Sequence, residues 1–427
     1  MDFRLAPSYH RRVAVSEQLS TVLSFEEARR VVEEHAAELH GNGRELIPLL
    51  DAAGRVLAET LAADRDFPPF PRAARDGYAL RAADAQQAPA SLDVVAEIKA
   101  GAAQLPELKP RQAAAIMTGA AAPDGSDAVV MVEHTTRADD RVRVMRAVSP
   151  GENIVPAGSE ARRGAKLLQP GARLGYAEFA LAAAIGRPRV LVYSKPRVAV
   201  LATGDEVVDV DVSPGLTQIR NSNSYSLAAQ IQSAGAEPVL LPIAPDEPNR
   251  LRELLAEGFE ADLLLIAGGV SMGKYDLVEQ ALSEMQAEFL FTGALIQPGK
   301  PIVFGRVPCG GDTISCKYFF GLPGNPISTM VTFELFARPM IDALAGATAR
   351  KLAFVHARLK TTIKTKTGLK RFLPALISGE FEQSEVELVK WQGSGDIASA
   401  ARANCFVVVP PDRDRIEAGE WVPVLLR

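Results

Sequence analysis

The chain has 427 residues, of which 47% are hydrophobic and 23% charged, an ordinary balance for a globular protein. At roughly 100–200 residues per domain, this length predicts two to four domains. The formal net charge is −5, which excludes an overall positive charge that would attract nucleic acid or an anionic membrane. Any anion-binding site must therefore be local.

Cysteine usage and hydropathy indicate the compartment. The three cysteines are odd in number and lack a metal-ligand spacing, which is typical of a reducing environment. The longest apolar stretch, around Phe179–Ile185, is cut short by Gly186-Arg187-Pro188 and is too short to span a bilayer. No apolar export signal follows Met1. We therefore expect a soluble, cytoplasmic protein without nucleic-acid or membrane partners.

The first half of the chain predicts one helix followed by small β-rich modules. Ser24 and Glu27 form a capping box, and the apolar residues that follow recur at helical spacing. From about residue 45 to 190 the chain instead shows short β-like runs between Pro and Gly turns, such as Ala128–Val132, Val142–Val144 and Lys166–Leu168.

From Lys195 the pattern changes to alternating strands and helices. The expected strands are Val198–Leu201, Val239–Leu241, Leu263–Ile266 and Tyr318–Phe320. The expected helices are Ser224–Ala234, Arg250–Glu257 and Ile327–Leu344. Apolar strands that alternate with amphipathic helices predict a doubly wound parallel sheet covered on both faces. Beyond Gly346, about 80 residues return to β patterns and predict a small β-barrel.

Two glycine-rich loops follow strands of this predicted sheet. Gly268–Gly273 includes Gly268, Gly269, Ser271 and Gly273, and Gly321–Pro326 includes Gly324 and Asn325. In an open α/β sheet, ligands bind beyond the carboxyl ends of the strands, where backbone N–H groups can cradle phosphate. Each loop alone also fits a tight turn that needs positive φ. Neither is a Walker A or a dinucleotide motif, so we expect a phosphate-type pocket of another kind.

Acidic residues stand at the other strand ends. They are Asp205, Glu206, Asp246, Glu247 and Asp276. Carboxylates beside a phosphate pocket repel the ligand unless a hard cation lies between them, and Mg²⁺ suits that position. Solvated loop acids are the alternative, most of all for Glu247. Lys300 lies in Pro298-Gly299-Lys300-Pro301 and could bind an oxyanion, although an exposed lysine is the commoner case.

Taken together, these motifs resemble the MoeA family, which includes the E-domain of gephyrin-type proteins. The resemblance runs from about Leu23 to the C-terminus. It is carried by these segments in the family order: Asp76-Gly77-Tyr78-Ala79, Met117-Thr118-Gly119-Ala120, Gly151-Glu152-Asn153-Ile154, Thr203-Gly204-Asp205-Glu206, Gly268–Gly273, Pro298–Pro301 and Gly321–Pro326.

The resemblance implies a multidomain fold of α/β and β modules. We expect a discontinuous linker-like domain (residues 20–60 and 150–192), an inserted β-rich domain (61–149), a molybdopterin-binding α/β domain (193–346) and a C-terminal β-barrel domain (347–427). It also implies a homodimer whose active site lies at the subunit interface, between the α/β domain of one subunit and the inserted domain of the other.

The activity that the resemblance implies is that of a molybdopterin molybdenumtransferase. Such an enzyme inserts molybdate into adenylylated molybdopterin and releases AMP with the help of Mg²⁺, giving molybdenum cofactor. Positions that match the family's catalytic residues are Asp76, Thr118, Glu206, Asp246 and Asp276, and the last three are also the metal ligands. Substrate-binding positions are the glycine loops together with Lys300, Ser328, Arg371 and Ser394.

The sequence departs from the family pattern at several positions. The loop before Asp76 reads Pro71-Arg72-Ala73-Ala74-Arg75, Gln297 replaces a common lysine, Val155 replaces a frequent arginine, and Glu160 replaces a frequent aspartate. Since a cation is lost at Gln297, our hypothesis is that Arg72 or Arg75 supplies the missing positive charge.

Three other interpretations remain open. The adenylyltransferase of the preceding step has a similar α/β domain, but it is a single domain, and it is also a candidate for transient contact with this chain. A paralogue that handles tungstate cannot be separated from one that handles molybdate by sequence. A non-enzymatic scaffold is not expected, because that role in gephyrin-like relatives relies on an extra N-terminal domain and a long linker.

Overall fold

The computed structural model describes residues 21–269, 277–309 and 312–427. The chain divides into two compact units, one formed by residues up to Glu45 together with Tyr193–Arg427, and the other by Leu46–Val192. No helix in the described part of the chain is both long and apolar enough to cross a membrane.

The first unit is built on a six-stranded sheet with the order β17-β14-β18-β23-β22-β19. Its strands are β14 (Arg197–Ala202), β17 (Glu237–Leu240), β18 (Leu263–Ala267), β19 (Glu288–Phe291), β22 (Val303–Cys309) and β23 (Asp312–Leu322). Strands β17, β14, β18 and β23 run parallel, whereas β22 pairs antiparallel with both β23 and β19. The predicted parallel sheet is therefore correct for these four strands, and the sheet as a whole is mixed.

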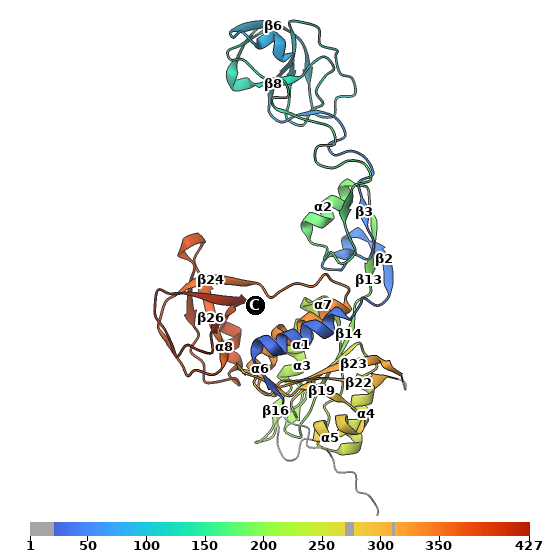
Figure 1. Cartoon of the computed structure of the whole chain (residues 1–427), viewed down its shortest axis with the longest axis vertical. Helices are drawn as coiled ribbons and strands as arrows, with labels where there is room; N and C mark the ends of the chain where they lie inside the picture. Colours follow the sequence, from blue (N-terminus) through green and yellow to red (C-terminus); the bar gives the residue numbers. More distant parts are fainter. Residues whose placement is uncertain (1–20, 270–276, 310–311) are drawn as a thin grey trace, which may run out of the picture. The chain divides into compact units, whose positions relative to one another are not determined.

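Helices cover both faces of this sheet (Figure 1). They are α1 (Phe25–Ala37), α3 (Ser222–Ser233), α4 (Pro248–Gly258), α5 (Leu277–Glu284), α6 (Pro326–Thr332) and α7 (Arg338–Leu344). One core joins α1, α3, α6 and α7 to one face, and a second core joins α4 and α5 to the other. Burial on both faces explains why these strands are apolar throughout.

The predicted capping box is present at the start of α1. The Ser24 side chain accepts a hydrogen bond from the Glu27 N–H, and the Glu27 carboxylate accepts one from the Ser24 N–H. Ala28, Val32 and Ala36 form a buried stripe of this helix and belong to the α/β core. Helix α1 therefore packs with the α/β sheet, although the sequence suggested that residues 20–60 belong to the linker-like domain. The four domain boundaries stay a prediction.

The single helix predicted over Ile327–Leu344 is divided. A π-helical turn, Phe333–Ala337, separates α6 from α7. Pro339 has no N–H to donate to the Leu335 carbonyl at the usual helical spacing, and the guanidinium of buried Arg29 donates to that carbonyl instead. A contact with a distant helix therefore stabilises this irregular turn.

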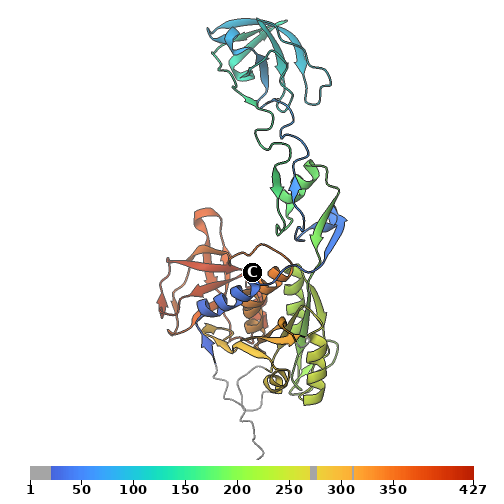
Figure 2. The same cartoon turned by 45° about the vertical axis from the view of Figure 1, so that its right-hand side comes forward.

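The predicted C-terminal barrel is also present in the first unit (Figure 2). Strands β26, β27, β24, β30 and β28 form a closed ring, because β26 pairs with β27 and also with β28. Their bounds are β24 (Phe354–Leu359), β26 (Lys370–Ser378), β27 (Glu385–Leu388), β28 (Cys405–Val409) and β30 (Trp421–Leu426), with helix α8 (Ile397–Arg402) beside them. A separate core fills the ring.

Short pairings complete the first unit. They involve β1 (Val22–Leu23) with β20 (Gly293–Ala294), β15 (Val207–Val208) with β16 (Ile219–Arg220), β25 (Ile363–Lys364) with β29 (Arg415–Ile416), and β21 (Ile296–Gln297) with β26. The last of these places Gln297 opposite Arg371. The barrel is thereby joined directly to the segment that leads into Pro298–Pro301.

The second unit contains a six-stranded sheet of order β8-β5-β7-β6-β10-β9, with cores on both faces. Its strands are β5 (Gly77–Leu80), β6 (Ala90–Ile98), β7 (Gln112–Ile116), β8 (Ala128–Met131), β9 (Thr135–Ala138) and β10 (Arg141–Val144). Three two-stranded pairs and one helix form the rest: β2 (Arg44–Pro48) with β13 (Arg189–Tyr193), β3 (Leu61–Ala62) with β12 (Lys166–Leu168), β4 (Arg72–Ala73) with β11 (Ile154–Val155), and α2 (Tyr176–Ala184).

Candidate active site

The carboxyl ends of four adjacent strands carry the predicted loops of the first unit. Thr203, at the end of β14, bridges to Ala244 beyond β17, and its N–H donates to Ala267 at the end of β18. The Gly268 N–H in turn donates to Leu322 at the end of β23. These contacts hold the loops side by side, as expected for the carboxyl edge of a parallel sheet.

The glycines of this edge allow close backbone approach. Gly268 has φ +95° and Gly269 has φ +63°, and a Cβ at Gly269 would lie 2.5 Å from the Thr203 Oγ1. A Cβ at Gly324 would lie 3.6 Å from the Cα of Gly268. The two predicted glycine loops are therefore neighbours. Ser271, Gly273 and Asp276 lie outside the described residues.

The acids at the strand ends face one another. The Asp246 N–H donates to Asp205 Oδ1 over 3.1 Å. Partial burial raises the pKa of Asp246, and the charges of Asp205 and Glu206 raise it further. The charges of Asp205 and Glu206 thus disfavour the ionised form of Asp246, which is the electrostatic condition that a bound cation relieves. No group of three His, Cys, Asp or Glu side chains close enough to hold a metal ion is found among the described residues.

Residues predicted to bind an anion lie on α6, the barrel and the loop before β22. Ser328 is buried in α6, Lys300 is exposed, and Arg371 is buried at the start of β26. The guanidinium of Arg371 donates to the Leu369 carbonyl over 3.0 Å, and burial lowers its pKa. It forms no ion pair with an acid in the described part of the chain. A buried cation without a carboxylate is a ready partner for an anionic ligand.

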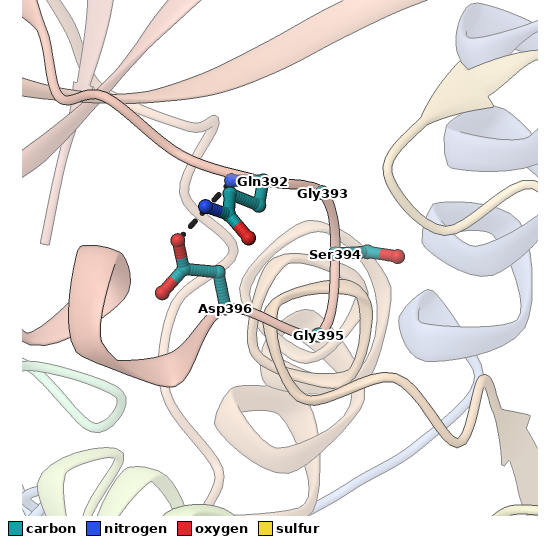
Figure 3. Close-up of a pocket in the computed structure, with 5 residues that line it drawn as sticks. All are labelled: Gln392, Gly393, Ser394, Gly395 and Asp396. Atoms are coloured by element: carbon teal, nitrogen blue, oxygen red, sulfur yellow. Dashed lines mark hydrogen bonds between the residues drawn. The ribbon is translucent and has the colours of Figure 1, made fainter.

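Ser394 lies in an open pocket of about 700 Å³ that is lined by Gln392–Asp396. The Ser399 hydroxyl, the Ser399 N–H and the Gln392 N–H donate to Asp396, and these hydrogen bonds, in that order, lower its pKa. Figure 3 shows the Ser394 side chain pointing away from Asp396 and Gln392. The Ser394 carbonyl accepts from the Ile327 N–H over 2.9 Å, so this pocket adjoins the first turn of α6.

In the second unit, Asp76 and Thr118 are brought together although 42 residues separate them. Asp76 Oδ1 accepts from the Thr118 N–H at 2.6 Å and from the Thr118 hydroxyl at 2.8 Å. These two hydrogen bonds, the backbone one first, lower the pKa of Asp76. The carboxylate is therefore held ionised and in one orientation at the surface.

The two arginines of the altered loop differ. Arg72 forms an ion pair with Glu160 over 2.8 Å, so two departures from the family pattern are partners. Arg75 is exposed and forms no ion pair or hydrogen bond with the described residues. Hydrogen bonds from the Ala73 N–H to Ala120 and from the Ala74 N–H to Asn153 hold the backbone before it.

Sequence reasoning missed Asn223 and Asp396 as members of these loops. The Asn223 side chain donates to the Gly324 carbonyl over 2.8 Å. Its signal was visible, because Asn221-Ser222-Asn223-Ser224 offers more capping side chains than one helix start can use. For Asp396 the signal was an acid directly before a helix and near Ser394.

Comparison with known proteins covers nearly all of the chain. Models of the MoeA N-terminal region (domain I and II), of a probable molybdopterin binding domain and of the MoeA C-terminal region (domain IV) match residues 23–186, 199–343 and 356–426. The molybdopterin molybdenumtransferases of Nostoc sp. and Bacillus subtilis are 37% and 34% identical. These matches cover 89% of this chain and 88% of the Nostoc protein, and 90% and 89% for B. subtilis.

A solved structure is similar over the same length. The molybdopterin biosynthesis MoeA protein of Pyrococcus horikoshii matches with a TM-score of 0.75 and 29% identity, over 95% of this chain and 100% of the other. The family resemblance inferred from the loops is confirmed. By its sequence relatives and its fold, this chain belongs to the MoeA family.

Proposed function

We propose that this chain is a molybdopterin molybdenumtransferase, which inserts molybdate into adenylylated molybdopterin, releases AMP and yields molybdenum cofactor. The observation that carries the proposal is the carboxyl edge of the mixed sheet, where two glycine loops adjoin Asp246, whose pKa is raised by burial and by the charges of Asp205 and Glu206. Curated relatives of this name, at 31–37% identity over most of the chain, support the same activity.

Side chains on the barrel and on the segments that contact it bind the anion in this scheme. Arg371 is buried and forms an ion pair with no carboxylate among the described residues. Strand β21, which precedes Lys300, pairs with the strand that contains Arg371, and the Ser394 carbonyl accepts a hydrogen bond from the first turn of α6. An oxyanion such as molybdate or a substrate phosphate compensates a buried guanidinium more fully than water does. We assign Lys300, Ser328, Arg371 and Ser394 to oxyanion binding.

Magnesium binding at the strand ends stays a proposal, because the described residues alone do not bring three acidic side chains within reach of one ion. Of the predicted ligands, Glu206 and Asp246 offer hard carboxylate oxygens, and the raised pKa of Asp246 reflects negative charge that a cation would neutralise. Asp276, which was also predicted to be a ligand, lies outside the described residues and stays a prediction. When bound, Mg²⁺ supplies Lewis-acid polarisation of a phosphoryl oxygen.

The protein's own groups then orient the substrate and manage protons. The ionised Asp76, fixed by Thr118, can accept a proton or orient a hydrogen-bond donor of the substrate. The glycine loops offer backbone N–H groups to phosphate without a side chain in the way. Electrostatic stabilisation and positioning therefore carry most of the catalysis in this scheme.

Of the two arginines in the altered loop, the exposed Arg75 is the better candidate for binding molybdate. Arg72 is committed to Glu160, and Arg75 has no partner among the described residues. Replacement by alanine is expected to raise the KM for molybdate about fivefold for Arg75 and less than twofold for Arg72, because one charge-assisted contact is lost only in the first case. Equal KM values for both variants and wild type would remove Arg75 from the site.

We further propose that the enzyme works as a cytoplasmic homodimer. The oxyanion preference is not distinguished by the residues present, since tungstate has the same charge and tetrahedral shape as molybdate. Competition of the two oxyanions for the same protein would rank them.

The proposed reaction is tested with purified protein, adenylylated molybdopterin, molybdate and Mg²⁺. AMP release that depends on molybdate supports the proposed function. Accumulation of adenylylated molybdopterin from ATP and molybdopterin would instead identify an adenylyltransferase, which was the nearest alternative from sequence.

A further inference from the structure

Asn223 lies in the first turn of α3 and reaches across to the second glycine loop. Its Nδ2 donates to the Gly324 carbonyl over 2.8 Å, which joins residues 101 positions apart in the sequence. Because a carbonyl oxygen only accepts, this contact also determines which end of the carboxamide faces Gly324.

Local helix structure does not account for this asparagine. The N-cap of α3 is Asn221, whose side chain accepts from the Ser224 N–H over 3.1 Å. Asparagine inside a helix is less favourable than most alternatives when it does not cap. The side chain of Asn223 is therefore available for a contact outside its own helix.

The second polar atom of the same carboxamide makes no hydrogen bond with the described residues, a property that it shares with Oε1 of Gln230 on the same helix. Asn223 Oδ1 is buried and has no hydrogen-bond partner in the described part of the chain. Buried acceptors are normally paired, and an apolar side chain of the same size would leave no such atom. Packing alone would favour leucine here, so the single hydrogen bond to Gly324 is the feature that asparagine adds.

Gly324 is the point at which the two glycine loops approach each other. Its Cβ position lies 3.6 Å from the Cα of Gly268, and the Gly268 N–H is bonded to Leu322 two residues earlier. The Thr329 hydroxyl in α6 donates to the carbonyls of Pro323 and Asn325, the residues on either side of Gly324. Asn223 instead bonds to the carbonyl of Gly324 itself, at the point where this loop approaches Gly268.

We propose that Asn223 is a positioning residue for substrate binding, which holds the Gly324 loop against Gly268 through its carboxamide; this rests on the function proposed above. Without the anchor, the loop samples other positions, and binding has to restore the one seen here. Affinity for the adenylylated substrate and for AMP then falls, while the reacting groups, once aligned, work at their usual rate.

The experiment compares Asn223→Ala and Asn223→Leu with Gln230→Ala. Leucine keeps the volume and removes the unpaired acceptor, so this variant is expected to fold. Gln230 is the matched control, because it lies on the same helix and its amide donates to the Met330 carbonyl over 3.1 Å, away from the loop tip. Measured quantities are the thermal midpoint, kcat and KM for adenylylated molybdopterin, and the Kd of AMP by calorimetry.

Both Asn223 variants are expected to raise KM and the AMP Kd about fivefold to tenfold, the effect of one lost hydrogen bond, with kcat within about twofold. Gln230→Ala is expected to lower the thermal midpoint but leave KM within about twofold. Unchanged KM and Kd in both Asn223 variants, or an equal rise in Gln230→Ala, would overturn the assignment. If wild-type protein released no AMP, the proposed function would fall, whereas the AMP affinities would still decide the role of Asn223.

Discussion

At the residue scale, charge repulsion and hydrogen bonding divide the candidate acids into two kinds. Asp246 is strained electrostatically, because burial and the neighbouring Asp205 and Glu206 raise its pKa. Asp76 is the opposite case, because two hydrogen bonds from Thr118 lower its pKa. A bound cation would stabilise the ionised form of the first kind. The second kind is already ionised and can orient a substrate group or take part in proton transfer.

Asp246→Asn should stabilise the protein at neutral pH while it lowers activity. A raised pKa in the folded state means that the folded chain binds the proton more tightly than the unfolded chain. The associated stability is present below the ordinary pKa of 3.8 and is lost as pH rises through the folded value. Without Mg²⁺, calorimetry at pH 7 should give a higher thermal midpoint for Asp246→Asn than for wild type.

Added Mg²⁺ should reverse that order. It binds the folded wild-type site and raises its midpoint by mass action, but it stabilises the variant less. An equal Mg²⁺-induced shift in both proteins would show that Asp246 does not contribute to the cation site.

Thr118→Val should raise the pKa of Asp76 only part of the way to 3.8. The variant loses the side-chain hydrogen bond, whereas the backbone N–H, the larger cause, still stabilises the carboxylate. A carboxyl whose pKa is lowered by folding stabilises the folded protein at pH values above its ordinary pKa, and this stability is lost as the pH falls through the folded-state pKa. Because the folded-state pKa of Asp76 is higher in the variant, the variant should lose this stability at a higher pH than wild type. Carboxyl NMR titration measures the shift, and a pKa unchanged from wild type would mean that the hydroxyl contact is absent in solution.

At the element scale, the irregular π turn between α6 and α7 depends on helix α1. Arg29 is buried and donates to Leu335 within that turn, while its neighbour Arg30 is exposed and paired with Glu34 over 3.5 Å. Arg29→Met leaves a buried carbonyl without its donor and should cost on the order of 1–3 kcal/mol of unfolding free energy.

Arg30→Met is the matched control on the same helix. An exposed ion pair contributes little, so this variant should lose less than about 1 kcal/mol. Urea unfolding measures both changes. Equal losses would show that the Leu335 contact does not stabilise the turn.

Local patterns were sufficient for most elements but not for this turn or the antiparallel strands. The capping box of α1 and the strands β14, β17 and β18 follow from residues within each segment. Pro339 was a local signal for an interruption of the helix, but the donor to the Leu335 carbonyl, Arg29, lies about 300 positions away and no local pattern predicts it. The antiparallel β22 was missed, although the stretch between β19 and β23 contains no crossover helix, which parallel strands require.

The same division applies to the site. Acids and glycines at strand ends were predicted to meet, because the carboxyl ends of parallel strands share one edge. Asn223 was missed because its contact with Gly324 depends on how α3 packs against α6, which joins segments far apart in the sequence. The partnership of Arg72 with Glu160 was likewise hidden, since 88 residues separate them.

At the scale of the whole molecule, the chain contains two units with cores of their own. Strands β2 and β13, which are paired, bring the two ends of the second unit together. A fragment of residues 44–193 should therefore fold alone, with a cooperative thermal transition and a dispersed amide NMR spectrum. A fragment without such a transition would show that this unit depends on the rest of the chain.

One measurement tests the proposed transfer of molybdate most directly. It is molybdate-dependent AMP release from adenylylated molybdopterin in the presence of Mg²⁺, by wild type, Glu206→Gln and Glu247→Gln. Glu247 is the control, because it is an exposed acid before α4 whose side chain makes no capping hydrogen bond. We expect wild type and Glu247→Gln to release AMP. The rate of AMP release should fall at least about a hundredfold in Glu206→Gln, as for removal of a group that stabilises developing charge. Equal release by all three proteins, or none that depends on molybdate, would contradict it.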